Sequence, residues 1–298
     1  MEWSISSCFL NPGEHLDAET VRRLGKLGWR CLDLCAYPEA VLNAPEEYNF
    51  CFDGWRPWIH GIREEAERQG MHFNQSHNIV CNFLSPKTTD AEKWDAPKHI
   101  LEATAMLGGR TSLIHPIAFH DGRPYCWPEI RDANREYFLR LADTAAEYGV
   151  VLCMENMLSN RYFDGSTFKR CCTTMEELIE LVDRIDHEYV KIGLDVGHAH
   201  YMGIAPEDAL RQCGSRVKGL HLHDNDTFSD QHLPPFGGTI CWEKVMEALH
   251  DISYQGELTL EIQRPFRNLP SALKDAIYRY IGEVGDHLVK MYDGTAGG

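Results

Sequence analysis

The chain is poor in basic residues and in long apolar runs. It has 29 lysines and arginines against 45 aspartates and glutamates, which gives a formal net charge of −16. Such an excess of acid repels nucleic acid and anionic membranes, because both bind proteins largely through basic side chains. No apolar run is long enough to span a bilayer, and the opening segment MEWSISSCFL lacks the pattern of a signal peptide. We therefore expect a cytoplasmic protein that binds neither nucleic acid nor membranes.

Several common site signatures are also missing. The 11 cysteines contain no C-x-x-C pair, which argues against a zinc knuckle or a thioredoxin-like redox site. Cys35 and Cys153 lie inside apolar runs, so we interpret the cysteines as reduced thiols that pack as small apolar side chains. There is no G-x-G-x-x-G loop, Walker loop or G-x-S-x-G elbow, and the sequence gives no indication of a dinucleotide, nucleotide or serine-hydrolase site.

What the sequence does have is a regular alternation of strand-like and helix-like segments. The strand-like runs lie near residue 5 and at 31–37, 71–77, 111–116, 150–156, 190–196, 217–224 and 257–263. Amphipathic stretches separate them, and several end at a glycine, as helix C-caps do: Gly28, Gly70, Gly108 and Gly149. This rhythm predicts a single (β/α)8 TIM barrel in one domain, residues 1–298. The alternative, an open doubly wound sheet, normally carries a glycine-rich turn after its first strand, and CFLNPGEHL is a poor match to one.

Acids and an imidazole stand where four of these strands end. Glu155, Asp195, His221 and Glu261 close the predicted fifth to eighth strands. The C-terminal ends of barrel strands converge on one point, where enzymes of this fold keep their active sites. Burying carboxylates there costs roughly several kcal/mol each unless a cation lies among them. The sequence therefore predicts a divalent metal ion, and the mixed ligands suit Mn²⁺, Co²⁺, Zn²⁺ or Mg²⁺.

Five further acid or imidazole side chains fall at equivalent heights in the predicted barrel, and we interpret them as additional metal or substrate contacts: His77, His115, His198, Asp230 and His232. Alternatives are open for several positions. His77 and His115 could be hydrogen-bonded core histidines, and Asp195 could simply cap the turn at Val-Gly-His. We expect His223, close to His221, to face the opposite side of its strand and to pack between sheet and helix.

The best local basic patch is the segment RYFDGSTFKR at 161–170. It follows Glu155 closely in the sequence, which places it near one of the predicted ligands. A small anionic substrate is therefore compatible with the acidic chain.

Several strand-terminal motifs resemble the xylose isomerase-like TIM-barrel superfamily. They are E-N at 155–156, D-x-G-H at 195–198, H-x-H-D at 221–224, D-x-H-x-x-P-x-G-G at 230–238 and E-I at 261–262. The matching pieces keep their order from the third strand to the eighth, so the resemblance spans nearly the whole chain. This superfamily contains sugar phosphate isomerases and epimerases together with endonuclease IV.

Resemblance to the ketose 3-epimerase branch implies one Mn²⁺ or Co²⁺ held by Glu155, Asp195, His221 and Glu261. It also implies that Glu155 and Glu261 remove and return a proton beside a carbonyl through an enediolate. His198 resembles a histidine that contacts a substrate oxygen. The chain departs from that branch in one respect, because no arginine follows the seventh-strand histidine within HLHDNDTFSD.

Resemblance to endonuclease IV implies three Zn²⁺ ions held by all nine residues, in a phosphodiesterase acting on abasic DNA. The net charge of −16 argues against that substrate. The sequence therefore favours a divalent-metal-dependent isomerase or epimerase, with Mn²⁺ as cofactor, acting on a small sugar or polyol. The alternatives are a lyase or dehydratase on a keto-sugar or inosose, the zinc phosphodiesterase, and a non-catalytic barrel. Members of the superfamily are often dimers or tetramers, so the resemblance is compatible with a homo-oligomer, while the sequence itself does not indicate the oligomeric state.

Overall fold

The computed structural model describes residues 1–10, 15–36, 44–79, 85, 87–117, 124–161, 167–263 and 269–295. Eight parallel strands in these residues form one sheet: β1 (Trp3–Ser6), β2 (Cys31–Cys35), β3 (His72–His77), β4 (Thr111–Ile114), β5 (Val151–Glu155), β8 (Val190–Asp195), β9 (Val217–His221) and β10 (Leu258–Leu260). Their order is β10-β1-β2-β3-β4-β5-β8-β9, and a parallel bridge between Leu222 and Leu260 joins the two edges. The predicted (β/α)8 TIM barrel is confirmed.

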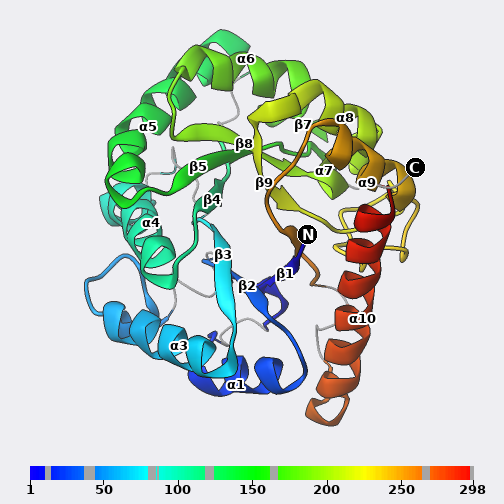
Figure 1. The fold of residues 1–298 in the computed structure, drawn as a ribbon. Helices are drawn as coiled ribbons and strands as arrows, with labels where there is room; N and C mark the ends of the chain where they lie inside the picture. Colours follow the sequence, from blue (N-terminus) through cyan, green and yellow to red (C-terminus); the bar gives the residue numbers. More distant parts are fainter. Residues whose placement is uncertain are drawn as a thin grey trace.

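A ring of helices surrounds the strands (Figure 1). The main helices of the described residues are α1 (Ala18–Lys26), α3 (Arg56–Gln69), α4 (Ala96–Leu107), α5 (Trp127–Tyr148), α6 (Met175–Ile185), α8 (Pro206–Cys213), α9 (Trp242–Asp251) and α10 (Ser271–Thr295). Gly70, Gly108 and Gly149 end α3, α4 and α5 in the left-handed conformation, with φ of 66°, 87° and 66°. A side chain would be strained there, which is why these glycines mark the helix ends in the sequence.

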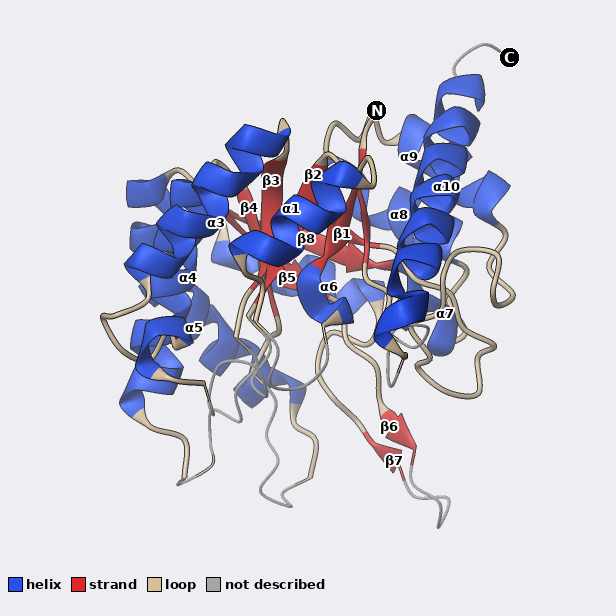
Figure 2. Cartoon of the chain, turned by 90° about the horizontal axis from the view of Figure 1, so that it is seen from below, coloured by secondary structure: helices blue, strands red, loops and turns tan. Residues whose placement is uncertain are grey.

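The alternation of strand-like and helix-like segments does not predict several short elements. They are α7 (Val196–Tyr201), the hairpin of β6 (Asn160–Arg161) and β7 (Thr167–Phe168), the 3₁₀ turns η1 (Ser7–Phe9), η2 (Glu46–Tyr48) and η4 (Gly214–Arg216), and the π-helical turn η3 (Ala91–Asp95). Figure 2 shows the hairpin projecting from the end of the barrel away from both chain termini. Helix α5 begins at Trp127 with Pro128 in its first turn, where the fixed φ of proline suits a helix start.

A leucine fills the interior of the barrel between three of its strands. Leu113 of β4 faces Gly193 of β8 and Gly219 of β9. A Cβ atom at Gly193 would lie 2.7 Å from Leu113 Cγ, and one at Gly219 would lie 2.6 Å from Leu113 Cδ1. The absence of side chains at these glycines therefore makes room for the leucine.

Among the described residues, no helix combines the length and the apolarity needed to cross a membrane.

Candidate metal centre

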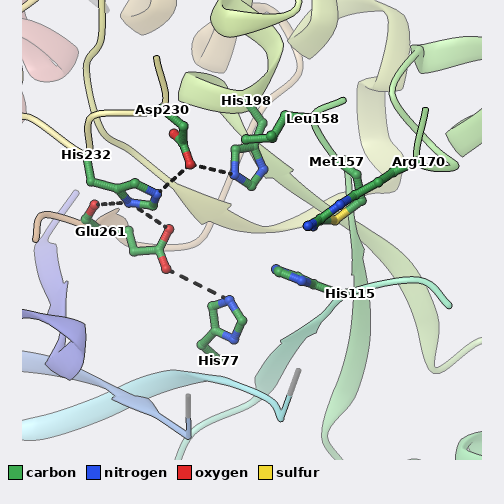
Figure 3. Close-up of a pocket in the computed structure, with 9 residues that line it drawn as sticks. All are labelled: His77, His115, Met157, Leu158, Arg170, His198, Asp230, His232 and Glu261. Carbon is green, nitrogen blue, oxygen red and sulfur yellow. Dashed lines mark hydrogen bonds and ion pairs between the residues drawn. The ribbon is translucent and has the colours of Figure 1, made fainter. Parts of the chain in front are cut away.

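The C-terminal end of the barrel brings all nine sequence-predicted residues together. Strands β3, β5, β8 and β9 end in His77, Glu155, Asp195 and His221. The others lie just beyond strands β4 and β10, on α7, or in the loop between β9 and α9: His115, Glu261, His198, Asp230 and His232. Six of the nine line one pocket, with Asp230, His232 and Glu261 along one side of it (Figure 3).

Glu155, His221 and Glu261 form the centre of the cluster. His221 Nδ1 lies 2.8 Å from Glu155 Oε1 and 3.5 Å from Glu261 Oε2, and all three side chains are buried. One donor atom from each of these residues and one from Asp195 lie within 4.8 Å of one another. Four donors at such separations surround a space suited to a single ion.

His77 and His115 approach the same glutamate from the other side. His115 Nε2 lies 3.1 Å from Glu155 Oε2, and His77 Nε2 lies 3.7 Å from the same oxygen. His77 also reaches to 3.9 Å from Glu261 Oε1. Glu155 Oε2 has no hydrogen bond within the described part of the chain, although it is buried. A buried carboxylate oxygen without a donor is costly, so this atom favours a cation at the site.

A second group gathers around Asp230. His232 Nε2 lies 3.0 Å from Asp230 Oδ2, and His198 Nε2 lies 3.7 Å from the same oxygen. Donor atoms of these three residues and of His223 also fall within 4.8 Å of one another. The geometry therefore offers more than one place for an ion.

Three histidines of the cluster are oriented by backbone carbonyls. His77 Nδ1 donates to Asn78 O at 2.8 Å, His198 Nδ1 donates to Asn156 O at 2.9 Å, and His232 Nδ1 donates to Glu261 O at 3.0 Å. In each case the proton on Nδ1 leaves Nε2 as the lone-pair nitrogen facing the carboxylates. Metal-binding histidines are commonly fixed in this way.

The expectation for His223 is wrong. The two residues at 221 and 223 are separated by a single residue, so an extended backbone puts both side chains on the same face. His223 is buried, with Nε2 3.1 Å from Asp195 Oδ2 and its ring stacked on that of His232 at 3.9 Å. It joins the cluster instead of packing between sheet and helix.

Asp195 combines the two roles that the sequence left open. Its Oδ1 accepts a hydrogen bond from His198 N at 2.7 Å and so caps α7. Its Oδ2 faces His223 and His198 within the cluster. Asn156 fixes the Asp195 backbone, since Asn156 Nδ2 donates to Asp195 O and Asn156 Oδ1 accepts from Asp195 N.

Without a bound ion, the negative charges of the carboxylates in the cluster are balanced by imidazoles. Burial raises the pKa of Glu155, but His221 and His115 outweigh it and hold that pKa well below its usual range. Burial lowers the pKa of His221, yet Glu261 and Glu155 raise it well above its usual value. Burial also lowers the pKa of His232, but Asp230 and Glu261 outweigh burial and raise that pKa to about 9. A divalent cation would supply the same positive charge and displace these protons, so the donor set fits such an ion.

Three comparisons place the chain among known proteins. The model of the xylose isomerase-like TIM-barrel family matches residues 21–279. The chain belongs to this family. Among curated proteins, the xylose isomerase-like chain is 31% identical over 251 residues to the D-psicose 3-epimerase of Ruminiclostridium cellulolyticum, covering 81% of this chain and 76% of that protein.

Other relatives match over shorter stretches. Identity is 38% over 165 residues with the D-psicose 3-epimerase of Enterocloster bolteae, covering 55% of this chain and 50% of that protein. It is 26% over 175 residues with the inosose isomerase of Bacillus subtilis, covering 56% and 59%. The chain thus spans about half the length of the Enterocloster bolteae protein and of an uncharacterized protein of Methanocaldococcus jannaschii.

Solved structures share the whole fold. A D-tagatose 3-epimerase-like protein superposes with a TM-score of 0.74 at 21% identity, covering 100% of both chains. The IOLI protein with a bound zinc atom superposes with a TM-score of 0.73 at 16% identity, covering 99% of both chains. At these identities the likeness shows the fold alone.

Sequence reasoning missed Asp33, misplaced His223, and indicated Arg170 only as part of the basic patch at 161–170. Asp33 lies within β2, buried, with Oδ2 3.5 Å from His221 Nε2 and 3.3 Å from Gln75 Nε2, which donates to it. Alternation would have found it, because Asp33 is a charged residue flanked by two leucines. Arg170 lines the pocket from the segment between β7 and α6. It belongs to the basic patch at 161–170, of which residues 162–166 lie outside the described part.

Proposed function

We propose that the chain is a divalent-metal-dependent sugar isomerase or epimerase, which moves a proton at a carbon next to a carbonyl. The observation that carries this proposal is the convergence of Glu155, Asp195, His221 and Glu261, whose donor atoms lie within 4.8 Å of one another. The curated relatives named above include D-psicose 3-epimerases and an inosose isomerase, which supports a sugar or polyol substrate.

Glu155, Asp195, His221 and Glu261 would hold the ion. Carboxylates with one imidazole suit Mn²⁺, and Co²⁺, Zn²⁺ and Mg²⁺ are compatible with the same donors. When bound, the ion would polarise the substrate carbonyl and fix the neighbouring oxygens. Asp33 would accept a hydrogen bond from the protonated His221 Nε2, which leaves Nδ1 as the lone-pair nitrogen that faces Glu155.

Glu155 and Glu261 would carry the proton. One carboxylate removes the proton from the carbon beside the carbonyl, which leaves an enediolate. The other donates a proton to the opposite face, which inverts the carbon, or to the neighbouring carbon, which moves the carbonyl. General acid–base transfer of this kind contributes typically about 10²–10⁴-fold in rate. His115, 3.1 Å from Glu155 Oε2, and His232, 3.5 Å from Glu261 Oε2, would hold the two carboxylates in place.

Solvent deuterium incorporation into a panel of ketoses, 3-oxo-glycosides and inososes tests the proposal. The wild-type protein loaded with Mn²⁺ should exchange a carbon-bound proton of at least one substrate. Glu261→Gln should lower that exchange by about 10²-fold or more, because the amide cannot accept the proton. Its circular dichroism spectrum should be unchanged. Glu247→Gln, an exposed change on α9, is the matched control and should behave as wild type. Exchange at the wild-type rate in Glu261→Gln would refute the proton-transfer role.

A lyase or dehydratase acting on a keto-sugar or inosose would share the first proton transfer. The two outcomes differ in the product, since loss of water or of a leaving group lowers its mass and epimerisation does not. Mass spectrometry of the same reaction mixtures separates them.

A zinc phosphodiesterase on abasic DNA is the second candidate, and the group formed by His198, His223, Asp230 and His232 favours it. That reading predicts about three zinc ions per chain, whereas sugar chemistry predicts about one tightly bound divalent ion. Elemental analysis of the purified protein measures the count. Nicking of an abasic duplex by the protein would reverse the ranking.

A further inference from the structure

Arg170 faces the pocket without an ion-pair partner among the described carboxylates. It lines the pocket beside His115, Met157 and Leu158, and Figure 3 shows its guanidinium end directed into the pocket from the side opposite Asp230, His232 and Glu261. Its Nε atom is buried and has no hydrogen bond within the described residues. A buried donor left without an acceptor costs about 1–3 kcal/mol, so an acceptor from a ligand is the natural partner.

Arginines elsewhere in the described chain commonly have a counter-charge. Arg22 pairs with Glu65 at 3.0 Å, Arg56 with Glu102 at 2.7 Å and Arg216 with Asp183 at 2.6 Å. In a chain with 45 acidic residues, a carboxylate partner is easy to provide. No carboxylate among the described residues forms an ion pair with Arg170, although the pocket itself is rich in acids.

The backbone on both sides of Arg170 is held in place. Glu177 at the start of α6 accepts hydrogen bonds from Lys169 Nζ at 2.9 Å and from Cys172 N at 3.1 Å. Met157 N, in the loop after β5, donates to Cys172 O at 2.8 Å. The charge of Lys169 is therefore used to anchor the segment, while the neighbouring Arg170 is presented to the pocket. Such prior ordering lowers the cost of binding a ligand.

We propose that the sugar substrate carries an anionic group, a carboxylate or a phosphate, that pairs with Arg170. This inference rests on the proposed function, since it assigns the substrate class of the same pocket. The ion would balance the negative charges of Glu155, Asp195 and Glu261. The positive charge of Arg170, on the opposite side of the pocket, would then pair with no carboxylate among the described residues. An anionic group avoids Asp230 and Glu261 by lying on that side. A planar guanidinium matches both carboxylate and phosphate through paired N–H donors. The pocket has a cavity volume of about 140 Å³, which suits a small ligand.

Exchange of substrate protons with D₂O tests the inference on matched keto-sugars. The set comprises a neutral ketose, its phosphate ester and the corresponding keto-sugar acid. The wild-type protein should give its highest kcat/KM with an anionic member. Arg170→Met should lower that value by about 10–100-fold, as the loss of a charged hydrogen bond would, and should change the neutral ketose by less than threefold. Arg135→Met on α5, exposed, removes the same net charge outside the pocket and should match wild type. Whether the phosphate or the acid responds more strongly to Arg170→Met identifies the anionic group.

Two results would overturn the inference while leaving the proposed function standing. One is a wild-type preference for the neutral ketose, and the other is an equal loss for neutral and anionic substrates in Arg170→Met. If no substrate exchanges at all, the proposed function fails, and calorimetric titration of the Mn²⁺-loaded protein with inorganic phosphate then decides about Arg170. A dissociation constant at least tenfold higher in Arg170→Met than in Arg135→Met supports the anion site. Equal constants contradict it.

Discussion

Asp33 and His221 face one another inside the barrel as two buried polar side chains. Asp33 Oδ2 lies 3.5 Å from His221 Nε2, while Asp33 Oδ1 and His221 Nε2 have no hydrogen-bond partner among the described residues. A carboxylate behind a histidine raises the basicity of the other ring nitrogen and fixes its orientation. Asp33 is therefore a positioning residue for the nitrogen that faces Glu155.

Replacing this carboxylate should weaken metal binding. The amide of Asp33→Asn can donate to His221 Nε2, which favours the tautomer with its proton on Nδ1, where the ion would bind. We expect the affinity of the metal-stripped protein for Mn²⁺ to fall by about 10–100-fold, measured by calorimetric titration. Asp143→Asn, exposed on α5, removes the same charge and should leave the affinity unchanged. An unchanged affinity in Asp33→Asn would show that Asp33 does not orient His221.

At the level of single residues, position along a strand decides what the sequence can predict. Glu155, Asp195 and His221 each end a run of apolar residues, so the pattern alone places them at the mouth of the barrel. Asp33 lies two residues before the end of β2. A charged residue between two leucines indicates that it faces away from them, but not which residue it contacts. Arg170 comes from a connecting segment, and its contact with the pocket depends on the tertiary placement of that segment.

At the level of elements, the junction of β8 with α7 is closely packed. Gly197 lies in the first turn of α7, against His223, and a Cβ atom at position 197 would overlap the imidazole ring. The motif D-x-G-H therefore combines a helix cap from Asp195, a position without a side chain at Gly197 and a cluster histidine at His198. The glycine allows His223 to reach Asp195.

Gly197→Ala should disturb this packing. Overpacking of a buried site costs typically about 1–3 kcal/mol, and relief of the overlap requires His223 to move away from Asp195. We expect a lower free energy of unfolding in urea. Gly61→Ala in the middle of α3 is the control, since no atom lies within 4 Å of the added Cβ. That change should raise the free energy of unfolding by up to about 1 kcal/mol through helix propensity. Equal stability of the two variants would contradict the packing argument.

Helices of several turns could be predicted from the sequence, whereas the shortest helices and strands could not. The helices that end at Gly70, Gly108 and Gly149 have both periodicity and a stop signal. Helix α7 has six residues, too few for a periodic pattern, and its start depends on the Asp195 cap. Strands β6 and β7 have two residues each and pair only with one another.

At the level of the whole molecule, the barrel follows from the repeated alternation of strand and helix. Eight parallel strands direct their C-terminal ends to one place, and this topology alone brings residues as distant as His77 and Glu261 together. The substrate does not follow from topology, because it depends on side chains such as Arg170 in the connecting segments. Fold and cluster are thus predictable from the chain pattern, whereas specificity requires the structure.

The central claim is that a divalent ion at Glu155, Asp195, His221 and Glu261 makes proton transfer possible. Solvent deuterium incorporation, measured on the same protein before chelation, after exhaustive chelation and after addition of Mn²⁺, tests it most directly. The exchange should disappear on chelation and return with about one equivalent of the metal per chain. Exchange that persists at its original rate in a fully metal-stripped protein would contradict the claim.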